Sequence, residues 1–310
     1  MFAPPPDRPT ECFTTLPAEF RRNGRSAWAD HNKHGAALHS FLEGPCFDRE
    51  GRLYVVDIPW GRIFRIGTDG CWELFCEYDG WPNGLKFHRD GRLFVADYRR
   101  GILTIDPTTR AISTVVAGWR SESFKGVNDL VFADDGSLWF TDQGQTGMTD
   151  PSGRVFRLAP DGTLHCLTDR VPSPNGIVVA GGGKAVLVAT RGNAIWHLPV
   201  HLDGGTSKAR TFIQLSGGGG PDGLALDEQG GLAVCHAGLG SVWLFSAQGE
   251  PLARYRSCRG LSTTNLAFGG ADRRSLFVTE SESGSILTAR LPHRGQRLFG
   301  DAGPPPAAAP

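Results

Sequence analysis

The sequence predicts an all-β protein with the architecture of a six-bladed β-propeller. The 310 residues include 42 Gly and 21 Pro and are 40% hydrophobic, a profile that favours many short strands and turns over long helices. A chain of this length exceeds most single compact domains unless the fold is a barrel, a propeller or another repeat. One sequence unit recurs six times along the chain, and its spacing selects the propeller.

Each copy of the unit begins with a polar residue, alternates apolar and polar residues, turns, and ends with a second apolar strand. The copies are EGPCFDREGRLYVVD (43–57), NGLKFHRDGRLFVAD (83–97), NDLVFADDGSLWFTD (128–142), NGIVVAGGGKAVLVAT (175–190), DGLALDEQGGLAVCH (222–236) and TNLAFGGADRRSLFVTE (264–280). Weaker strand signals follow each copy, which gives about four strands per repeat of roughly 40–50 residues, the pattern of a propeller blade. A β-helix would repeat over a far shorter distance, and a sandwich would not repeat this motif six times.

The repeats divide the chain into three parts. Residues 41–291 are expected to form the propeller, and residues 1–40 to form an N-terminal extension that is partly disordered or caps or closes the ring. Residues 292–310 end in GPPPAAAP and are expected to be a disordered tail.

Composition excludes several classes of partner and compartment. The formal net charge is zero, so no basic stripe indicates nucleic acid. The sequence contains neither a signal peptide nor an apolar run of membrane-spanning length, which predicts a cytoplasmic protein without a membrane partner. The seven cysteines are scattered without a Cys-x-x-Cys pair, so we expect reduced thiols, with Cys46 and Cys235 buried in strands. The oligomeric state cannot be predicted.

The repeat places six polar residues around the central channel. The first strand of each blade lines that channel, so the residues that open these strands should form a ring of Glu43, Asn83, Asn128, Asn175, Asp222 and Thr264. A lone Asn-Gly or Asp-Gly pair is usually only a turn, but six in register converge on one axis. Two carboxylates with oxygen-only neighbours suit a hard divalent cation such as Ca²⁺, and would repel each other without it. We therefore expect a metal site in the central channel.

The second strand of each copy returns to the same face and should form an outer ring of Asp57, Asp97, Asp142, Thr190, His236 and Glu280. His236 is its only imidazole and a candidate base or substrate donor. The Asp residues could instead tie the following turns by accepting backbone N–H groups. The loop QGQTGMTDPSG (143–153) is a candidate lid. We expect substrate contacts from Asn83, Asn128, Asp142 and His236.

Other catalytic motifs are absent or out of context. GGGPDG (218–223) has the glycine spacing of a dinucleotide site, but a strand rather than a helix follows it. The sequence contains no Gly-x-Ser-x-Gly elbow, His-Glu-x-x-His motif or phosphate loop. These absences favour a reaction without a protein nucleophile.

At the level of whole motifs, the chain resembles the senescence marker protein/gluconolactonase family of six-bladed propellers. The residues that carry the resemblance are EGP (43–45), NDLVFADDGSLWFTD (128–142), PNGIVV (174–179) and PDGLALDEQG (221–230). They fall in the family's order, one per blade, and the match covers about residues 40–291.

The resemblance implies a lactone hydrolase with one divalent cation in the channel. The metal-binding Glu, Asn and Asp of the family correspond to Glu43, Asn175 and Asp222, and Asn128 corresponds to an Asn that contacts metal or substrate. The adjacent Asp129 corresponds to the proposed general base.

The segment before Asn128 departs from the family pattern. Sugar-lactonase members often carry Arg or Pro there, whereas this chain has Gly126 and Val127. Lys125 lies close by and is a further candidate for substrate binding. The sequence therefore leaves a lactone other than a sugar lactone, or an ester, open as the substrate.

Three functions remain as alternatives. The first is metal-assisted lactone hydrolysis, in which the cation polarises the carbonyl and Asp129 or His236 accepts a proton from water. The cation is expected to be Ca²⁺, with Zn²⁺, Mn²⁺, Fe²⁺ or Mg²⁺ as other possibilities. The second is a phosphotriesterase-like hydrolase of the diisopropylfluorophosphatase type. The third is a non-catalytic interaction platform, which would lack the axial metal.

Overall fold

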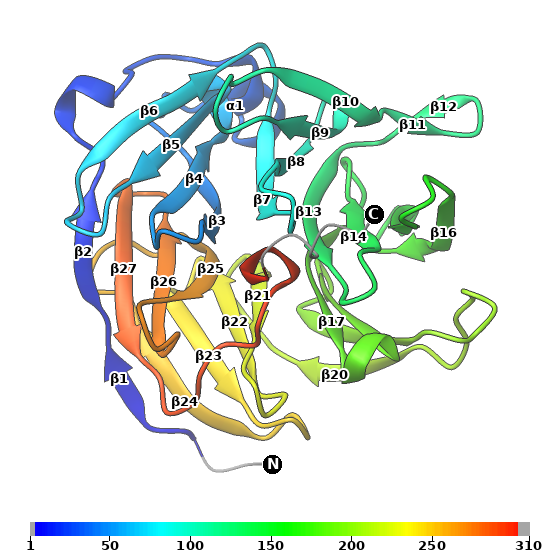
Figure 1. The fold of residues 1–310 in the computed structure, drawn as a ribbon. Helices are drawn as coiled ribbons and strands as arrows, with labels where there is room; N and C mark the ends of the chain where they lie inside the picture. Colours follow the sequence, from blue (N-terminus) through cyan, green and yellow to red (C-terminus); the bar gives the residue numbers. More distant parts are fainter. Residues whose placement is uncertain (1–3, 303–310) are drawn as a thin grey trace, which may run out of the picture.

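The computed structural model of the protein describes residues 4–302 and is an all-β six-bladed propeller, which confirms the predicted fold class (Figure 1). Blade 1 contains β3 (Leu42–Phe47), β4 (Leu53–Asp57), β5 (Arg62–Ile66) and β6 (Trp72–Glu77). Blade 2 contains β7 (Pro82–Phe87), β8 (Leu93–Asp97), β9 (Gly101–Ile105) and β10 (Ile112–Val116). Blade 3 contains β13 (Val127–Phe132), β14 (Leu138–Asp142), β15 (Gly153–Leu158) and β16 (Leu164–Val171). Blade 4 contains β17 (Pro174–Ala180), β18 (Ala185–Thr190), β19 (Ala194–Pro199) and β20 (Arg210–Gln214). Blade 5 contains β21 (Gly220–Leu226), β22 (Leu232–Ala237), β23 (Ser241–Phe245) and β24 (Pro251–Arg256). Blade 6 contains β25 (Thr263–Gly269), β26 (Ser275–Glu280) and β27 (Ser285–Arg290). The six predicted hairpins are the two innermost strands of the six blades.

The N-terminal segment completes the ring. Strand β2 (Glu11–Thr15) pairs antiparallel with β27 and is the fourth strand of blade 6, while β1 (Asp7–Pro9) pairs parallel with β24. In Figure 1 this blue segment follows the outer edge of blades 5 and 6. The propeller sheets therefore begin before residue 41, and one blade joins the two ends of the sequence.

Short elements fill the connections. Helices η1 (Ala18–Phe20) and α1 (Ala27–Asn32) link β2 to β3, and η2 (Ile58–Trp60) follows β4. The hairpin of β11 (Gly118–Trp119) and β12 (Glu122–Ser123) separates blades 2 and 3, and η3 (Gly181–Gly183) joins β17 to β18. No helix within residues 4–302 is long and apolar enough to cross a membrane.

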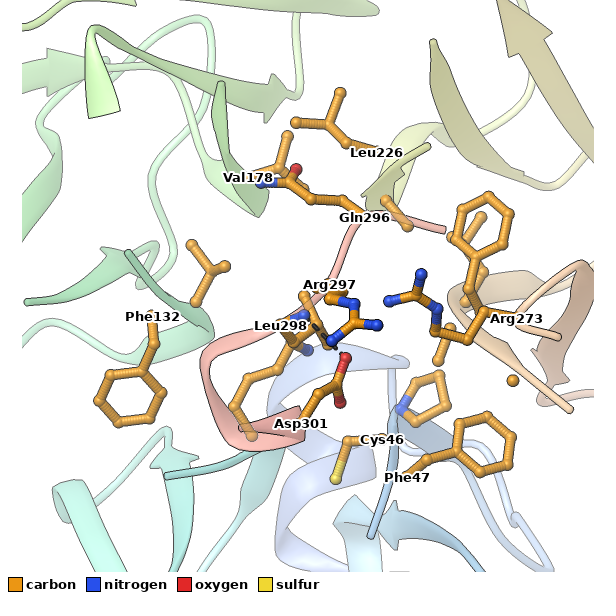
Figure 2. Close-up of a pocket in the computed structure, with 18 of the residues that line it drawn as sticks. Cys46, Phe47, Phe132, Val178, Leu226, Arg273, Gln296, Arg297, Leu298 and Asp301 are labelled. Atoms are coloured by element: carbon orange, nitrogen blue, oxygen red, sulfur yellow. Dashed lines mark hydrogen bonds between the residues drawn. The ribbon is translucent and has the colours of Figure 1, made fainter. Parts of the chain in front are cut away.

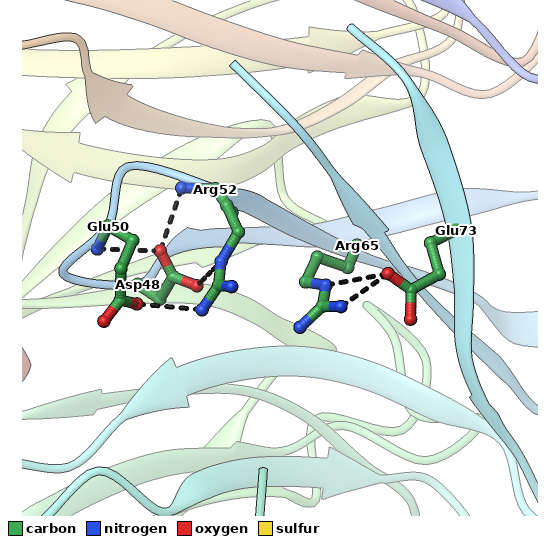
Figure 3. Close-up of polar contacts among 5 residues, drawn as sticks. All are labelled: Asp48, Glu50, Arg52, Arg65 and Glu73. Carbon is green, nitrogen blue, oxygen red and sulfur yellow. Dashed lines mark hydrogen bonds and ion pairs between the residues drawn. The ribbon is translucent and has the colours of Figure 1, made fainter. Parts of the chain in front are cut away.

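Local interactions of Asp48 and Gly51 fix the tight turn of blade 1. Asp48 Oδ1 accepts hydrogen bonds from the backbone N–H groups of Glu50 and Arg52, and the Asp48 carboxylate also binds the Arg52 guanidinium (Figure 3). Gly51 adopts φ +78°, which glycine reaches without steric cost. A second ion pair, Arg65 with Glu73, joins the outer strands of the same blade. The turn is thus fixed by local interactions, as the sequence pattern indicates.

The hydrophobic core consists of six clusters, one between each pair of neighbouring blades. The cluster between blades 1 and 2, for example, contains Tyr54 and Phe75 of blade 1 with Leu85 and Val95 of blade 2. Cys46 and Cys235 are buried in two of these clusters, as predicted, and all seven cysteines are free thiols. Burial between blades holds the inner strands at fixed distances around the axis.

All six inner strands carry a β-bulge at the same position. The pairing register with the second strand shifts just after the first or second residue of β3, β7, β13, β17, β21 and β25. Bulges re-aim side chains and are common beside functional sites. Here they lie where the polar ring residues enter the channel.

The C-terminal segment differs from the expected disordered tail. Residues 292–302 have a defined course that includes η4 (Phe299–Asp301), while 303–310 lie outside the described residues. Phe299 is buried and its ring stacks on Phe132 with centroids 5.5 Å apart. In Figure 1 this red segment lies over the centre of the ring. Apolar contacts that the Pro-rich composition did not reveal therefore hold it in place.

A cavity of about 590 Å³ lies beneath this segment, at the lower end of the channel. Apolar residues of the inner strands form much of its wall, including Phe47, Phe132 and Val178, and the guanidinium groups of Arg273 and Arg297 point towards each other within it (Figure 2). It is the larger of the two axial cavities, but the predicted polar ring is at the opposite end.

Candidate metal centre and active site

The end of the channel opposite the C-terminal segment, which we call the upper end, opens into a cavity of about 300 Å³. Its wall contains every residue of the ring predicted from register, namely Glu43, Asn83, Asn128, Asn175, Asp222 and Thr264. The structure thus brings together six residues that lie far apart in the sequence, from Glu43 to Thr264. The four predicted metal ligands are all within this group.

The two ring carboxyls destabilise each other's charged form. Burial and repulsion from Asp222 raise the pKa of Glu43 well above its usual value. Burial raises the pKa of Asp222 to about 7, although the positive charges of Arg191 and Lys33 oppose this effect. Two carboxylates that repel each other in one cavity favour a bound cation.

Hydrogen bonds orient the neighbouring donors. Asn128 Nδ2 donates to Gln143 Oε1 at 2.9 Å, which leaves the amide oxygen of Asn128 as its available donor atom for a metal. Glu43 Oε2 accepts from Asn265 Nδ2 at 2.9 Å and from the Gly44 N–H at 2.7 Å. The carboxylate and amide oxygens form a hard donor set. Within residues 4–302 no three His, Cys, Asp or Glu side chains come together as metal ligands, so amide oxygens would have to complete the coordination.

The other two ring residues have different surroundings. Thr264 donates its hydroxyl proton to the Leu42 carbonyl at 2.9 Å, which ties blade 6 to blade 1. Asn83 is buried in the wall beside Glu43 and Asn128. Thr264 is therefore occupied by a structural bond, whereas Asn83 lines the cavity.

A second layer lies directly beneath the ring. Four blades have glycine there, and the other two have Asp129 and Asn265, which are buried. A Cβ on Gly84 would lie 2.8 Å from Asp129 Oδ1, and a Cβ on Gly223 would lie 2.2 Å from Asn265 Oδ1. The glycines therefore make room for the two polar side chains. Asp129 Oδ1 accepts from the Leu130 N–H at 2.8 Å, and burial raises the pKa of this carboxyl.

The predicted outer ring lies behind the cavity wall. Its six residues are fully buried and do not line the cavity, namely Asp57, Asp97, Asp142, Thr190, His236 and Glu280. Asp142 accepts from the Gly126 N–H and binds Arg154 Nε at 2.6 Å. These strand ends return to the upper face, but their side chains satisfy the turns and strands of their own blades.

His236 is not placed as a base or a substrate donor. Its Nε2 lies 2.9 Å from the carbonyl oxygen of Gly217, and its Nδ1 lies 3.2 Å from Trp243 Nε1. The imidazole therefore donates through Nε2 and accepts through Nδ1, and burial lowers its pKa. With both nitrogens engaged, it has neither an exposed lone pair nor a proton to offer in the cavity.

Lys125 also lies away from the cavity wall. Its Nζ binds Ser152 Oγ at 2.7 Å in an exposed position. The neighbouring Gly126 has no space for a side chain, because a Cβ there would lie 2.5 Å from the ring of Tyr98. Tyr98 itself lines the cavity. An aromatic ring thus occupies the position towards which a longer residue 126 would project.

Several cavity residues were missed by sequence reasoning. They come from outside the six ring positions, namely Trp28, Asn32, Lys33, Phe41, Tyr98, Gln143 and Arg191. Gln143 and Gln145 belong to the loop expected as a lid, and Gln145 Nε2 donates to Asn32 Oδ1 and to the Tyr98 hydroxyl. Tyr98, Gln143 and Arg191 each come one residue after a repeat, and this shared position was their only sequence signal. Helix α1 lies outside every repeat.

Comparison with known proteins agrees with the fold. The family model described as the SMP-30/Gluconolactonase/LRE-like region matches residues 41–282. A lactonase drp35 of Staphylococcus aureus is 30% identical over 240 residues, covering 73% of this chain and 72% of that protein. A gluconolactonase of Zymomonas mobilis is 28% identical over 274 residues, covering 78% and 76%.

A solved structure of a calcium-binding regucalcin from Agrobacterium tumefaciens shares the fold. It superposes with a TM-score of 0.72 at 22% identity, covering 83% of this chain and 92% of that one. The family match spans all six ring residues, from Glu43 to Thr264. The chain therefore belongs to the SMP-30/gluconolactonase/LRE-like family.

Proposed function

We propose that the protein is a divalent-metal-dependent hydrolase that opens a lactone. The observation that carries this proposal is the convergence of Glu43, Asp222 and the amides of Asn128 and Asn175 on one cavity. The names of the two sequence relatives, a lactonase and a gluconolactonase, support the same reaction class.

Glu43, Asn128, Asn175 and Asp222 would hold the cation. When bound, a divalent cation such as Ca²⁺ supplies Lewis-acid polarisation of the lactone carbonyl and stabilisation of its developing negative charge. The Asn265 amide holds the Glu43 carboxylate, and Gln143 holds the Asn128 amide, so two of the four ligands are oriented in advance.

Asp129 is our candidate for the group that accepts the proton of the attacking water. It is buried in the layer directly below Asn128, and the proposed role requires a water molecule to link it to the cavity. Burial raises its pKa towards the range in which a carboxylate is an effective base. Water adds to the carbonyl carbon, the bond to the ring oxygen breaks, and that oxygen takes up a proton. The product is a hydroxy acid, which releases one proton on ionisation.

The decisive experiment follows this proton release with a panel of lactones, in calcium and after chelation. The proposal expects hydrolysis that chelation abolishes and that added metal restores. The Asp129→Asn variant should lose at least about a hundredfold in kcat while still binding calcium. Undiminished hydrolysis in the metal-free protein would overturn the metal-dependent mechanism.

The same panel separates the alternative reactions. A fluorophosphate substrate tests the phosphotriesterase-like alternative, because fluoride release can be measured under identical conditions. Failure of every lactone and ester, together with an absence of bound metal by elemental analysis, would leave the interaction platform as the better hypothesis.

A further inference from the structure

We propose that Lys33 and Arg191 form an anion-binding subsite at the mouth of the upper cavity, so that the preferred lactone carries a carboxylate or phosphate group. This inference deepens the lactone hydrolysis proposed above and rests on it. It names a class of substrate that the ring residues alone do not specify.

Lys33 is held at the cavity by the N-terminal helix. The Ser26 hydroxyl caps α1 by accepting from the Ala29 N–H at 3.1 Å, and Trp28 packs on Phe41 with ring centroids 4.8 Å apart. Lys33 follows α1 directly, and its Nζ lies 4.4 Å from the centroid of the Phe41 ring. The helix thus delivers an ammonium group to the cavity wall.

Arg191 reaches the same cavity from blade 4. It follows β18, and its Nη1 donates to the Gly219 carbonyl at 3.3 Å. Lys33 and Arg191 line the same cavity wall as the ring residue Asp222. Two cations from separate parts of the fold therefore converge above the ring.

Neither cation is neutralised by an ion pair in the part of the chain that the structure describes. Lys33 contacts aromatic rings, and Arg191 contacts a backbone carbonyl. A divalent cation would balance the negative charges of Glu43 and Asp222. Lys33 and Arg191 then add two positive charges, and at least one remains in excess even with Asp129 ionised. A cavity with such an excess concentrates anions.

The ligand chemistry follows from these groups. A guanidinium and an ammonium bind carboxylate or phosphate oxygens through charge-assisted hydrogen bonds. A lactone carbonyl at the metal ligands and an anionic substituent at Lys33 and Arg191 would occupy the same cavity together. An uncharged sugar lactone would leave both cations without a partner.

The test compares three six-membered sugar lactones that differ only in the exocyclic group. This group is a hydroxymethyl, a carboxylate or a phosphorylated hydroxymethyl. The wild-type protein should show the higher kcat/KM with one of the charged lactones, and this preference should fall as salt is added. Lys33→Met and Arg191→Gln should each lower the charged-to-neutral ratio of kcat/KM by roughly 10- to 100-fold, mainly through KM. The charged lactone that responds identifies the anion.

Two exposed cations outside the cavity provide matched controls. Lys184→Met and Arg170→Gln remove the same charges, and both residues are exposed and lie outside the cavity wall. They should leave the ratio unchanged. Equal losses of Lys33→Met on charged and neutral lactones, or a wild-type preference for the neutral lactone, would overturn the subsite.

A binding measurement separates failure of the subsite from failure of the proposed function. If no lactone is hydrolysed, the lactonase proposal fails, and calorimetry with the acyclic dianion glucarate and the monoanion gluconate still tests the subsite. The subsite is supported if the wild type binds glucarate more tightly than gluconate and Lys33→Met abolishes this difference. Equal affinity of wild type and Lys33→Met for glucarate refutes it.

Discussion

Replacing Asp222 with Asn should stabilise the metal-free protein while weakening its metal site. In the absence of metal, burial raises the pKa of Asp222 from 3.8 to about 7. Below pH 3.8 the folded and unfolded states both hold this proton, whereas between pH 3.8 and 7 only the folded state does. The unfolded state therefore gains stability relative to the folded state as the pH rises through this window.

The size of the effect follows from the shift. About three pKa units at about 1.4 kcal/mol per unit give roughly 4 kcal/mol. This value is an upper limit, because Asp222 is partly open to the cavity. Metal-free Asp222→Asn should therefore exceed wild type in free energy of unfolding at pH 8 by up to this amount, and the two proteins should converge near pH 4.

Urea unfolding in chelator at pH 4, 6 and 8 measures this difference. Calcium at a hundred times its dissociation constant should then add about 2.7 kcal/mol to wild type and much less to the variant. A metal-free variant that is less stable than wild type at pH 8, with a parallel pH profile, would refute the reasoning. Asp142→Asn is the contrasting control: it removes the buried carboxylate that binds Arg154 Nε and leaves only the longer ion pair with the exposed Glu122, so it should cost about 3–5 kcal/mol with or without metal.

Asn265→Ala should weaken calcium binding about tenfold, because Glu43 loses the amide N–H that holds Oε2; calorimetric titration checks this, and unchanged affinity would exclude a positioning role. His236→Gln should lower the free energy of unfolding by about 1–3 kcal/mol but leave kcat nearly unchanged, because both ring nitrogens serve structural bonds; a large loss of kcat in the folded variant would restore His236 as a candidate base. Gly84→Ala places a Cβ 2.8 Å from Asp129 Oδ1 and should destabilise the fold by about 1–3 kcal/mol, whereas Gly147→Ala, whose Cβ meets nothing within 4 Å, should not. Denaturant unfolding of both glycine variants tests that difference, and equal stability would show that the channel wall relaxes freely.

The polar ring was predictable from the sequence because its geometry repeats. Alternation of apolar and polar residues marks each inner hairpin, and turn glycines such as Gly51 fix where each hairpin reverses. Once six equivalent hairpins surround one axis, equivalent positions must meet. Glu43 and Asp222 were placed in one cavity by this symmetry, without knowledge of any contact between them.

Other parts of the site depend on contacts that no repeat encodes. The orientation of His236 depends on Gly217 and Trp243, and Asn265 serves Glu43 from the other end of the chain. Lys33 reaches the cavity only because α1 packs beside η2.

The sequence by itself therefore determined the number of blades, the inner hairpins and the identity of the ring, because these follow from local periodicity repeated around an axis. The tertiary structure decided which polar groups face the cavity and which satisfy one another behind its wall. A buried polar group must find a partner, and that partner is a neighbour in space. The ends of the chain show the same division: β2 completes blade 6 and residues 292–302 cover the lower channel through apolar and backbone contacts with distant strands.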